Sequence, residues 1–577
     1  MLPNLSQGAL NRTMVDVFAG YNANLRCNEG EFSEMRNMTS EHYPVLSPRR
    51  KRDVIAEVGN PQGIICKDAL GYVDGENLIY SGKTFDLGLS TNAEDCPKQL
   101  ISMGAYLLIF PDKKYLNTAD ITDYGDIEAH FISQEGATTT YTMCNASAVE
   151  YENVYISAEA PEDKTNGEYW LDTSGETHTL KVWSESASMW VSVATTYIKI
   201  QCEGIGRQFS EGDGVKISGS VVEDLNNTMV IQMVSDNYIV VIGILDNVVS
   251  QTDELRVSRE VPVMEFVTEA NNRIWGCHYG IKDGETVNEI YACKLGDFRN
   301  WNSFAGISTD SYAVTVGSDG VFTGAITHLG YPLFFKENCI HKIYGNAPSS
   351  YQVATTQCRG VQKGSNRSLA IVNEILYYKS ATDICAFDGS LPQSISSALG
   401  YNTYSEVVGG SYKGKYYLSM KNTMGEYEML VYDTYKGLWH VEDNTKAVGF
   451  AMCDHLLYYL NENQLVCVEG TTEEDFEWMA TTGVIGYEYP DMKYVSRFNL
   501  RMKIEEGTKV EVFTEYDSDG VWHPQGELIG KGTTTFTLPV IPIRCDHMRI
   551  RIVGQGECKI FSLAKILEIG SDVPCSI

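Results

Sequence analysis

The sequence NRIWGC, from Asn272 to Cys277, and the sequence NEIYACKLGDFRNWNSF, from Asn288 to Phe304, decide the fold. Each begins with a short apolar run, and the polar residues between them are typical of a turn. Together they predict a β-hairpin. A second pair of runs, PLFFK and IHKIYGN, continues the pattern to Gly345. This stretch therefore reads as a series of short antiparallel strands.

The same pair of runs recurs toward the C-terminus. PLFFK, ILYYK, KYYLS and LLYYL start at Pro332, Ile375, Lys415 and Leu456, which are 43, 40 and 41 residues apart by subtraction. A period near 40 residues with four short strands per repeat is typical of a β-propeller. Two similar units, with LIYS and YLLIF, precede residue 135. We therefore predict an all-β propeller of six or seven blades.

The pattern divides the chain into four parts, and each part is expected to be made of strands. Residues 1–55 are an N-terminal arm that supplies closing strands, as often precedes a propeller. The propeller comprises 56–144 and 263–480, interrupted by a barrel-like β domain at 145–262. That interruption is too long for a loop and must carry its own core. Strict alternation in FNLRMKI and MRIRIVG predicts a C-terminal β-sandwich at 481–577.

Two groups of side chains are candidate binding residues. Trp170, Trp183 and Trp190 lie in the interruption, where they would form a glycan-stacking platform or pack in a core. Their alternating strand context favours the core. The second group is the basic tetrad formed by Arg49, Arg50, Lys51 and Arg52. It would contact a phosphate or a partner protein, or it would be a solvated turn, and the solvated turn is the preferred interpretation.

Composition excludes several classes of protein. The net charge of −31 argues against a surface that grips nucleic acid, which must be positive. The N-terminus lacks the pattern of a signal peptide, and no apolar run is long enough to span a membrane. Fifteen dispersed cysteines without a CxxC pair predict reduced thiols of a protein made in a cytoplasm. No metal site or cofactor is expected.

Motifs of catalysis are missing from the sequence. It contains no GxSxG, HExxH, Walker loop or dinucleotide fingerprint, and its ten histidines are dispersed. A propeller glycosidase would need two carboxylates that sequence cannot pair. SDGVF at Ser318 and SDGVW at Ser518 resemble an aspartate box only faintly. We therefore expect no catalytic residue and no enzymatic activity.

Three stretches resemble one family of proteins. The hairpin NRIWGC…NEIYACKLGDFRNWNSF, the opening from Phe18 to Arg49 and the closing from Arg544 to Val573 look like phage tail proteins of the hub, nozzle or DNA-stabilisation type. The resemblance implies a structural virion protein without catalytic residues. It implies a homo-oligomeric ring, commonly a hexamer, between the portal or adaptor and other tail proteins. DNA would pass through its channel without sequence-specific binding, and an acidic lumen would keep that DNA mobile.

The leading hypothesis is thus a ring in a phage tail that retains packaged DNA and conducts it during ejection. A tail protein that binds a receptor or polysaccharide through the interrupting domain is the alternative. A propeller glycosidase is the remote alternative. In the first two cases the protein is made in the host cytoplasm and resides in the virion.

Overall fold

The computed structural model describes residues 10–282, 284–488, 492–540 and 543–569. Strands dominate these residues, and the helices among them are five short 3-10 turns, η1 to η5. No helix in the described ranges has the length and apolarity that crossing a membrane requires. The predicted all-β class is confirmed.

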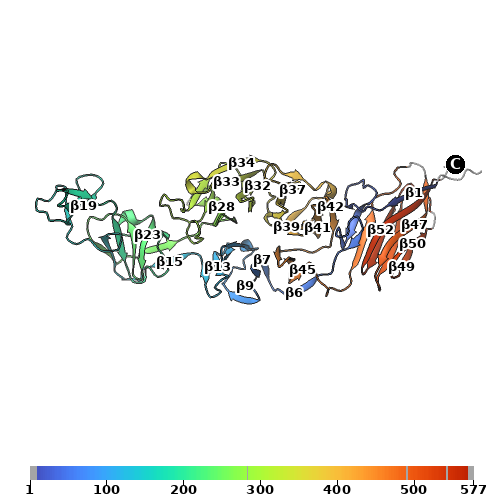
Figure 1. Cartoon of the computed structure of the whole chain (residues 1–577), viewed down its shortest axis with the longest axis horizontal. Coiled ribbons are helices and arrows are strands. Elements are labelled where there is room, and N and C mark those ends of the chain that lie inside the picture. The colour runs from blue at the N-terminus through green and yellow to red at the C-terminus, as the bar shows by residue number, and fades with distance from the viewer. Residues whose placement is uncertain (1–9, 283, 489–491, 541–542, 570–577) are drawn as a thin grey trace, which may run out of the picture. The chain divides into compact units, whose positions relative to one another are not determined.

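The described residues contain seven blades, each made of four antiparallel strands (Figure 1). Six are meanders of strands that are consecutive in sequence. Five of these, β7–β10, β11–β14, β27–β30, β31–β34 and β35–β38, are separate sheets, and the sixth, β39–β42, forms one end of a ten-stranded sheet. The seventh consists of β43, β44, β45 and β6, so its outermost strand comes from the N-terminal arm. The propeller is confirmed, with the larger of the two predicted blade numbers.

The strands of the first three meanders are short. They are β7 (Pro61–Lys67), β8 (Ala69–Asp74), β9 (Asn77–Tyr80), β10 (Lys83–Asp86), β11 (Gln99–Met103), β12 (Tyr106–Phe110), β13 (Lys114–Asn117), β14 (Tyr124–Asp126), β27 (Phe266–Ala270), β28 (Arg273–Lys282), β29 (Glu285–Ala292) and β30 (Tyr312–Thr315).

The later blades follow the 40-residue repeat. Their strands are β31 (Gly324–His328), β32 (Tyr331–Lys336), β33 (Cys339–Tyr344), β34 (Gln352–Gln357), β35 (Ala370–Val372), β36 (Ile375–Lys379), β37 (Ile384–Phe387), β38 (Gln393–Ser394), β39 (Ser405–Tyr412), β40 (Lys415–Lys421), β41 (Tyr427–Asp433), β42 (Leu438–Val441), β43 (Gly449–Cys453), β44 (Leu456–Leu460), β45 (Gln464–Cys467) and β6 (Asp53–Glu57).

Contacts divide the chain into two compact units. Unit 1 comprises Met1–Leu100, Phe334–Ile340 and Thr355–Ile577, and unit 2 comprises Ile101–Leu333 and His341–Ala354. Within unit 1, β43 packs on β7, which brings the last and first blades together. Within unit 2, the side chains of β11–β14 and β27–β30 share one core around Leu108, Ile274 and Trp301.

The interruption forms two sheets in unit 2. An eight-stranded sheet surrounds a core of its own. Its strands are β15 (Ala129–Ile132), β16 (Thr139–Cys144), β21 (Tyr197–Gln201), β22 (Gly214–Ser218), β23 (Thr228–Ser235), β24 (Tyr238–Ile242), β25 (Val249–Gln251) and β26 (Arg256–Arg259). Two of these strands, β15 and β16, precede residue 145, so the sheet draws on residues that the sequence places in the propeller. Tyr141 on β16 is fully buried in the core of this sheet, which is why the strand belongs to it.

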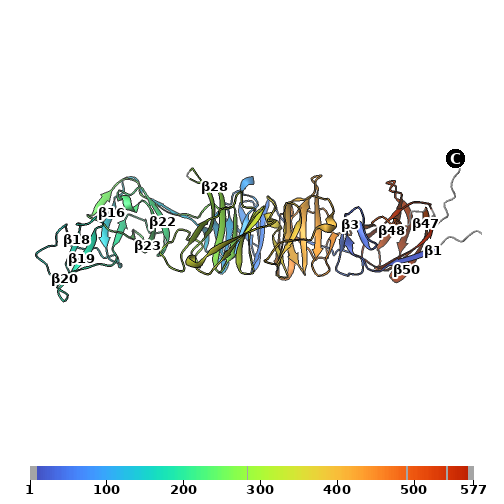
Figure 2. The same cartoon turned by 90° about the horizontal axis from the view of Figure 1, so that it is seen from above.

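The second sheet of the interruption is smaller. It contains β17 (Tyr155–Ser157), β18 (Tyr169–Asp172), β19 (Thr179–Ser184) and β20 (Met189–Ser192), labelled in part in Figure 2. β17 runs parallel to β18, and the other pairs are antiparallel.

Two sheets in unit 1 enclose the core of the C-terminal sandwich. One has the order β1-β52-β47-β50, and the other continues from blade β39–β42 through β2, β3, β46, β51, β48 and β49. The bounds are β1 (Leu10–Val15), β2 (Gly20–Tyr21), β3 (Glu31–Arg36), β46 (Glu477–Thr482), β47 (Lys493–Ile504), β48 (Lys509–Tyr516), β49 (His523–Ile529), β50 (Gly532–Pro539), β51 (Met548–Gln555) and β52 (Cys558–Ile569). The N-terminal arm thus contributes to both sheets.

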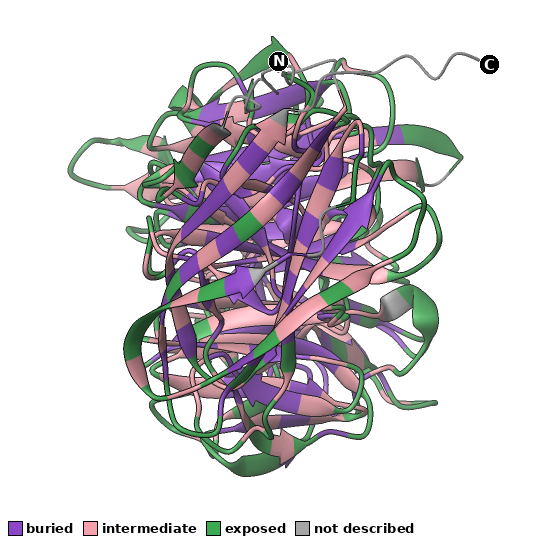
Figure 3. Ribbon diagram, turned by 90° about the vertical axis from the view of Figure 1, so that its right-hand side faces the viewer, coloured by how far each residue is buried: buried purple, intermediate pink, exposed green. Residues whose placement is uncertain are grey.

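Burial explains why these strands form. Along β47 buried positions alternate with more exposed ones, as the sequence predicts, and similar banding is visible in Figure 3. Trp478, Phe498 and Ile550 come from both sheets and meet in one core. The last residues of the family-like closing segment, after Ile569, lie outside the described residues.

Candidate functional site

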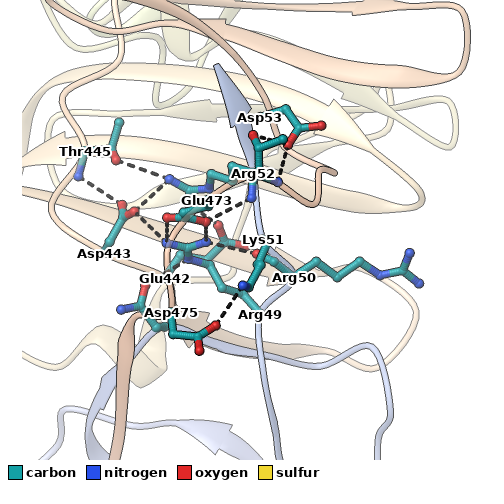
Figure 4. Close-up of polar contacts among 12 residues, drawn as sticks. Arg49, Arg50, Lys51, Arg52, Asp53, Glu442, Asp443, Thr445, Glu473 and Asp475 are labelled. Atoms are coloured by element: carbon teal, nitrogen blue, oxygen red, sulfur yellow. Dashed lines mark hydrogen bonds and ion pairs between the residues drawn. The ribbon is translucent and has the colours of Figure 1, made fainter. Parts of the chain in front are cut away.

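The basic tetrad lies on the extended segment between β5 (Ser47–Pro48) and β6. Its four side chains do not form one patch (Figure 4). Arg49 and Arg52 are buried, whereas Arg50 and Lys51 reach solvent. The acidic linker, residues 468–478, follows β45 and supplies several of the carboxylates around them.

Arg52 is the most buried cation of the tetrad, with 6% of the residue exposed against 8% for Arg49. Its guanidinium bonds Glu442 at 2.5 Å and Asp443 at 2.7 Å, and it donates to the Tyr459 hydroxyl at 3.0 Å. Burial works to raise the pKa of Asp443, but the charges of Arg52 and Arg49 outweigh it and hold that pKa below its usual value. The arginine therefore ties the arm to blade β39–β42.

Arg49 makes a bidentate pair with the linker. Its two terminal nitrogens lie 2.7 and 2.9 Å from the carboxylate oxygens of Glu473. Its Nε donates to Asn37 at 2.8 Å, and its guanidinium lies 4.0 Å from the Phe476 ring centroid. Glu473 also accepts the backbone N–H of Arg52 at 2.9 Å. Fork-shaped pairs of this kind fix geometry as well as charge.

Arg50 and Lys51 make looser pairs. Arg50 contacts Glu41 and lies 3.6 Å from Glu469, while Lys51 lies 2.7 Å from Asp475. These two cations, together with the edge of Arg49, line a cleft of about 650 Å³ beside the sandwich. A partner contact through the tetrad stays a prediction, and only Arg50 and Lys51 are placed to make one.

The three tryptophans meet in the sheet β17–β20. Trp190 is flanked by Trp170 and Trp183, each with its ring centroid 5.5 Å away and each approaching edge to face. Trp170 is buried and donates its indole N–H to the Ser157 carbonyl at 3.0 Å. Trp183 and Trp190 are half-buried. Thus Trp170 packs as core, whereas the other two rings keep access to solvent.

Strand register defines the tryptophan face of this sheet. Trp170 is opposite both Tyr155 and Lys181, and Trp183 is opposite Trp190, so all five side chains share one face. Tyr155 is 44% exposed.

Charged groups surround the rings of the tryptophan face. The Lys181 ammonium lies 4.8 Å from the Trp170 ring and 2.7 Å from Asp172, and Lys164 lies 4.2 Å from the Trp183 ring. Asp172 has a pKa held well below its usual value by hydrogen bonds from Lys181 and Ser174. Aromatic rings beside fixed polar groups are the usual composition of a ligand site.

A polar cleft of about 550 Å³ lies in unit 2, lined by residues of β14 and of the eight-stranded sheet, and sequence reasoning did not find it. Asp126 and Glu128 line it together with His130 and Arg299. Lys114 lies 2.6 Å from Asp126, and Lys113 lies 2.7 Å from Glu128. The only sequence signal was the D-x-E-x-H spacing, which is too common to single out.

The described residues contain no cluster of three or more histidine, cysteine, aspartate or glutamate side chains suited to a metal ion. Each carboxyl with a resolved pKa shift in these ranges is shifted downward. These groups stay ionised at neutral pH, as an ion pair or a nucleophile requires.

Comparison with known proteins identifies no family. No protein-family model matches the chain, and no curated protein matches its sequence. Among solved structures, an exo-β-1,3-galactanase from Phanerochaete chrysosporium is 9% identical, with a TM-score of 0.20, over 52% of this chain and 94% of that one. Apo AztD from Citrobacter koseri is 9% identical, with a TM-score of 0.26, over 84% and 98%. The phage phi92 endosialidase is 10% identical, with a TM-score of 0.26, over 89% and 80%.

These similarities concern the fold alone. Glycoside hydrolases recur among the similar structures, and this finding contradicts the sequence-based prediction that the chain is not an enzyme. That prediction took missing motifs as evidence, but a propeller places paired carboxylates on loops far apart in sequence, where no motif records them. The propeller part of the phage-tail resemblance is confirmed.

Proposed function

We propose that this chain is a phage tail protein that binds a polysaccharide through the tryptophan face of sheet β17–β20. The observation that carries the proposal is the shared face on which Trp183 and Trp190 remain accessible beside Tyr155, Lys181 and Asp172. The flat apolar face of a pyranose can pack on an indole, and its hydroxyls can bond charged side chains at the ring edge.

The assignment to a tail rests on the resemblance of three stretches of sequence and on the build of unit 1. There the N-terminal arm supplies strands to a blade and to both sandwich sheets, which suits a part that bears load. A homo-oligomeric ring that contacts portal, adaptor or other tail proteins belongs to the proposal. The net charge of −31 suits a surface past which DNA moves without sticking.

Substitution on the two faces of the sheet β17–β20 tests the binding site. Trp183→Ala and Trp190→Ala, in the full chain, should each weaken binding on an array of bacterial surface polysaccharides by tenfold or more. The matched controls are Met189→Ala and Val191→Ala, because both side chains point to the opposite face and are exposed. Equal binding by all four variants, or no binding by the wild type, would contradict the site.

The mass of the purified particle tests the ring. Light scattering or negative-stain images should show a closed oligomer, alone or after addition of its tail partners. A strictly monomeric protein at micromolar concentration that no partner recruits would contradict ring assembly while leaving polysaccharide binding untouched.

Glycoside cleavage is a second candidate function, favoured by the cleft that Asp126 and Glu128 both line. Cleavage needs two carboxylates flanking the bond. If the cleft acts, the wild type releases reducing ends from a polysaccharide that it binds, and Asp126→Asn or Glu128→Gln abolishes that release. Asp120→Asn is the control, because Asp120 is exposed nearby and does not line the cleft. No release by the wild type would exclude this candidate.

A further inference from the structure

Two cysteines lie on neighbouring strands where the last blade meets the first. Cys66 is on β7, and Cys453 ends β43. β43 packs directly on β7, so closely that a Cβ on Gly449 would lie 3.0 Å from the side chain of Ile64. Hydrogen bonding and charge at Cys66 contribute, after burial, to the raised pKa of the Cys453 thiol, which places the two side chains close together. Both cysteines are free thiols in this structure.

The two thiols differ in access. Cys66 is partly exposed, whereas Cys453 is 4% exposed. A soluble disulfide can therefore reach Cys66 first, and Cys453 is placed to act as the resolving thiol. Because the two residues lie in different blades, a bond between them joins segments of the chain that are 387 positions apart.

We propose that Cys66 and Cys453 are a built-in cross-linking site, which forms a disulfide across the junction of the first and last blades once the protein meets a low-molecular-weight disulfide such as oxidised glutathione. This property is independent of the polysaccharide site. A protein folded in a reducing cytoplasm would close its first and last blades covalently only after release into oxidising surroundings.

The chemistry proceeds in two exchanges. The Cys66 thiolate attacks oxidised glutathione, a Cys66–glutathione mixed disulfide forms, and one glutathione thiolate leaves. The Cys453 thiolate then attacks the Cys66 sulfur, the Cys66–Cys453 bond forms, and the second glutathione leaves. Two protein thiols are oxidised, and one glutathione disulfide is reduced to two thiols.

Electrostatics give the second exchange a distinctive pH dependence. Burial raises the pKa of Cys453 to about 12, together with the hydrogen bond and charge of Cys66 and the charge of Asp454, while a backbone hydrogen bond at Asp454 acts in the opposite direction. In the mixed disulfide Cys66 carries no charge, so its share of that rise disappears. Burial remains, so Cys453 is still a weak acid, and cross-linking should speed up as pH rises from 7 to 9.

The junction is otherwise held by non-covalent packing. Val58, Leu460 and Leu465 are buried there, with Ile64 and Tyr458 packed against them. A covalent bond across this cluster constrains the unfolded chain over a long loop, so the oxidised protein should have a Tm higher by ~2 °C or more.

The test uses the full chain, oxidised glutathione and non-reducing peptide mapping by mass spectrometry. We expect a peptide that joins Cys66 to Cys453, formed faster at pH 9 than at pH 7, and a Tm that rises on oxidation and falls back with dithiothreitol. Cys467→Ser is the matched control, because Cys467 is another buried thiol of the same blade and should leave the cross-link intact.

Three results would overturn the proposal. The first is stable glutathionylation of Cys66 with Cys453 still open to alkylation after denaturation. The second is a cross-link from Cys66 to Cys467 in place of Cys453. The third is an unchanged cross-linking pattern in Cys453→Ser. Because the first two results are read on the wild-type protein, poor folding of a variant cannot obscure them.

Discussion

Arg52 shows how much of the fold depends on one buried charge. It pairs with Glu442, whose side chain is 4% exposed, and with Asp443. Replacing Arg52 by methionine keeps the apolar stem but leaves Glu442 as a buried anion without its partner. Breaking a buried pair in this way costs ~3–5 kcal/mol. We expect a clear fall in Tm by calorimetry and faster hydrogen exchange in β6.

Lys51 provides the control for that substitution. It is the neighbour of Arg52 in sequence, but its pair with Asp475 lies at the surface. Exposed pairs contribute little to stability, so Lys51→Met should leave the Tm nearly unchanged. If both variants lowered the Tm equally, burial would not explain a difference between the contributions of Arg52 and Lys51 to stability.

Acid should loosen the same network. The pKa of Glu473 is also below its usual value, because the hydrogen bond and charge of Arg49 outweigh its burial. The pKa values of Asp443 and Glu473 are lower in the folded chain than in the unfolded chain, where they are about 4. Ionisation of these two carboxyls therefore stabilises the fold above about pH 4, and this stabilisation is lost as the pH falls through their folded-state pKa values. We expect the Tm to fall below about pH 4, and less steeply in Asp443→Asn. An identical pH slope in the variant would contradict this assignment.

The contacts of individual side chains are what the sequence predicted least well. The tetrad was visible in the sequence as four adjacent cations. Nothing local, however, indicated that Arg49 reaches Glu473, 424 positions away. Similarly, the alternating strand pattern favoured core packing for all three tryptophans, and Trp170 is buried. Which rings stay accessible depends on strand register, and register is set by partners that a linear pattern does not name.

At the scale of elements, the closing strand β6 depends on a close approach by Gly470. The Gly470 N–H donates to the Lys51 carbonyl at 2.7 Å, and a Cβ there would lie 2.4 Å from the Arg52 carbonyl carbon. Gly470→Ala should therefore push β6 away from β45, costing ~1–3 kcal/mol. Hydrogen exchange should speed up in β6 and β45.

Gly317→Ala is the matched control for this substitution. A Cβ at Gly317 meets nothing within 4 Å, and that residue is exposed. Its Tm and exchange rates should match those of the wild type. Unchanged exchange in Gly470→Ala would mean that the arm tolerates displacement and does not close the blade tightly.

The hairpin that decided the fold also shows where element prediction fails. The strands β28 and β29 form as expected, but β29 ends at Ala292, whereas the sequence run continues to Phe304. Arg273 explains the difference. It is buried, and it donates to the carbonyls of Cys293 and Asp310, each at 2.6 Å, which folds the intervening chain into a loop. An arginine in a strand pattern gives no sign of this role.

For the molecule as a whole, period and alternation predicted the propeller, the interruption and the sandwich, because each depends on repeated apolar spacing. What they could not predict is how far the parts share strands. β2 pairs with β42 of a blade and with β3, which in turn pairs with β46 of the sandwich. Short strands such as Gly20–Tyr21 carry too little pattern to be recognised in a sequence.

This shared sheet predicts that the sandwich and blade β39–β42 unfold together. Trp478 is fully buried on β46, and its indole donates to the Gly556 carbonyl at 2.9 Å. Trp478→Ala should cost ~3–5 kcal/mol in the sandwich. Because the hydrogen-bonded ladder is continuous through β3 and β2, amide protection should fall in β40 and β41 as well as in β51. If exchange rose only in the sandwich while β40 and β41 kept wild-type protection, the two parts would be independent folding units, and the arm would link them without coupling their stability.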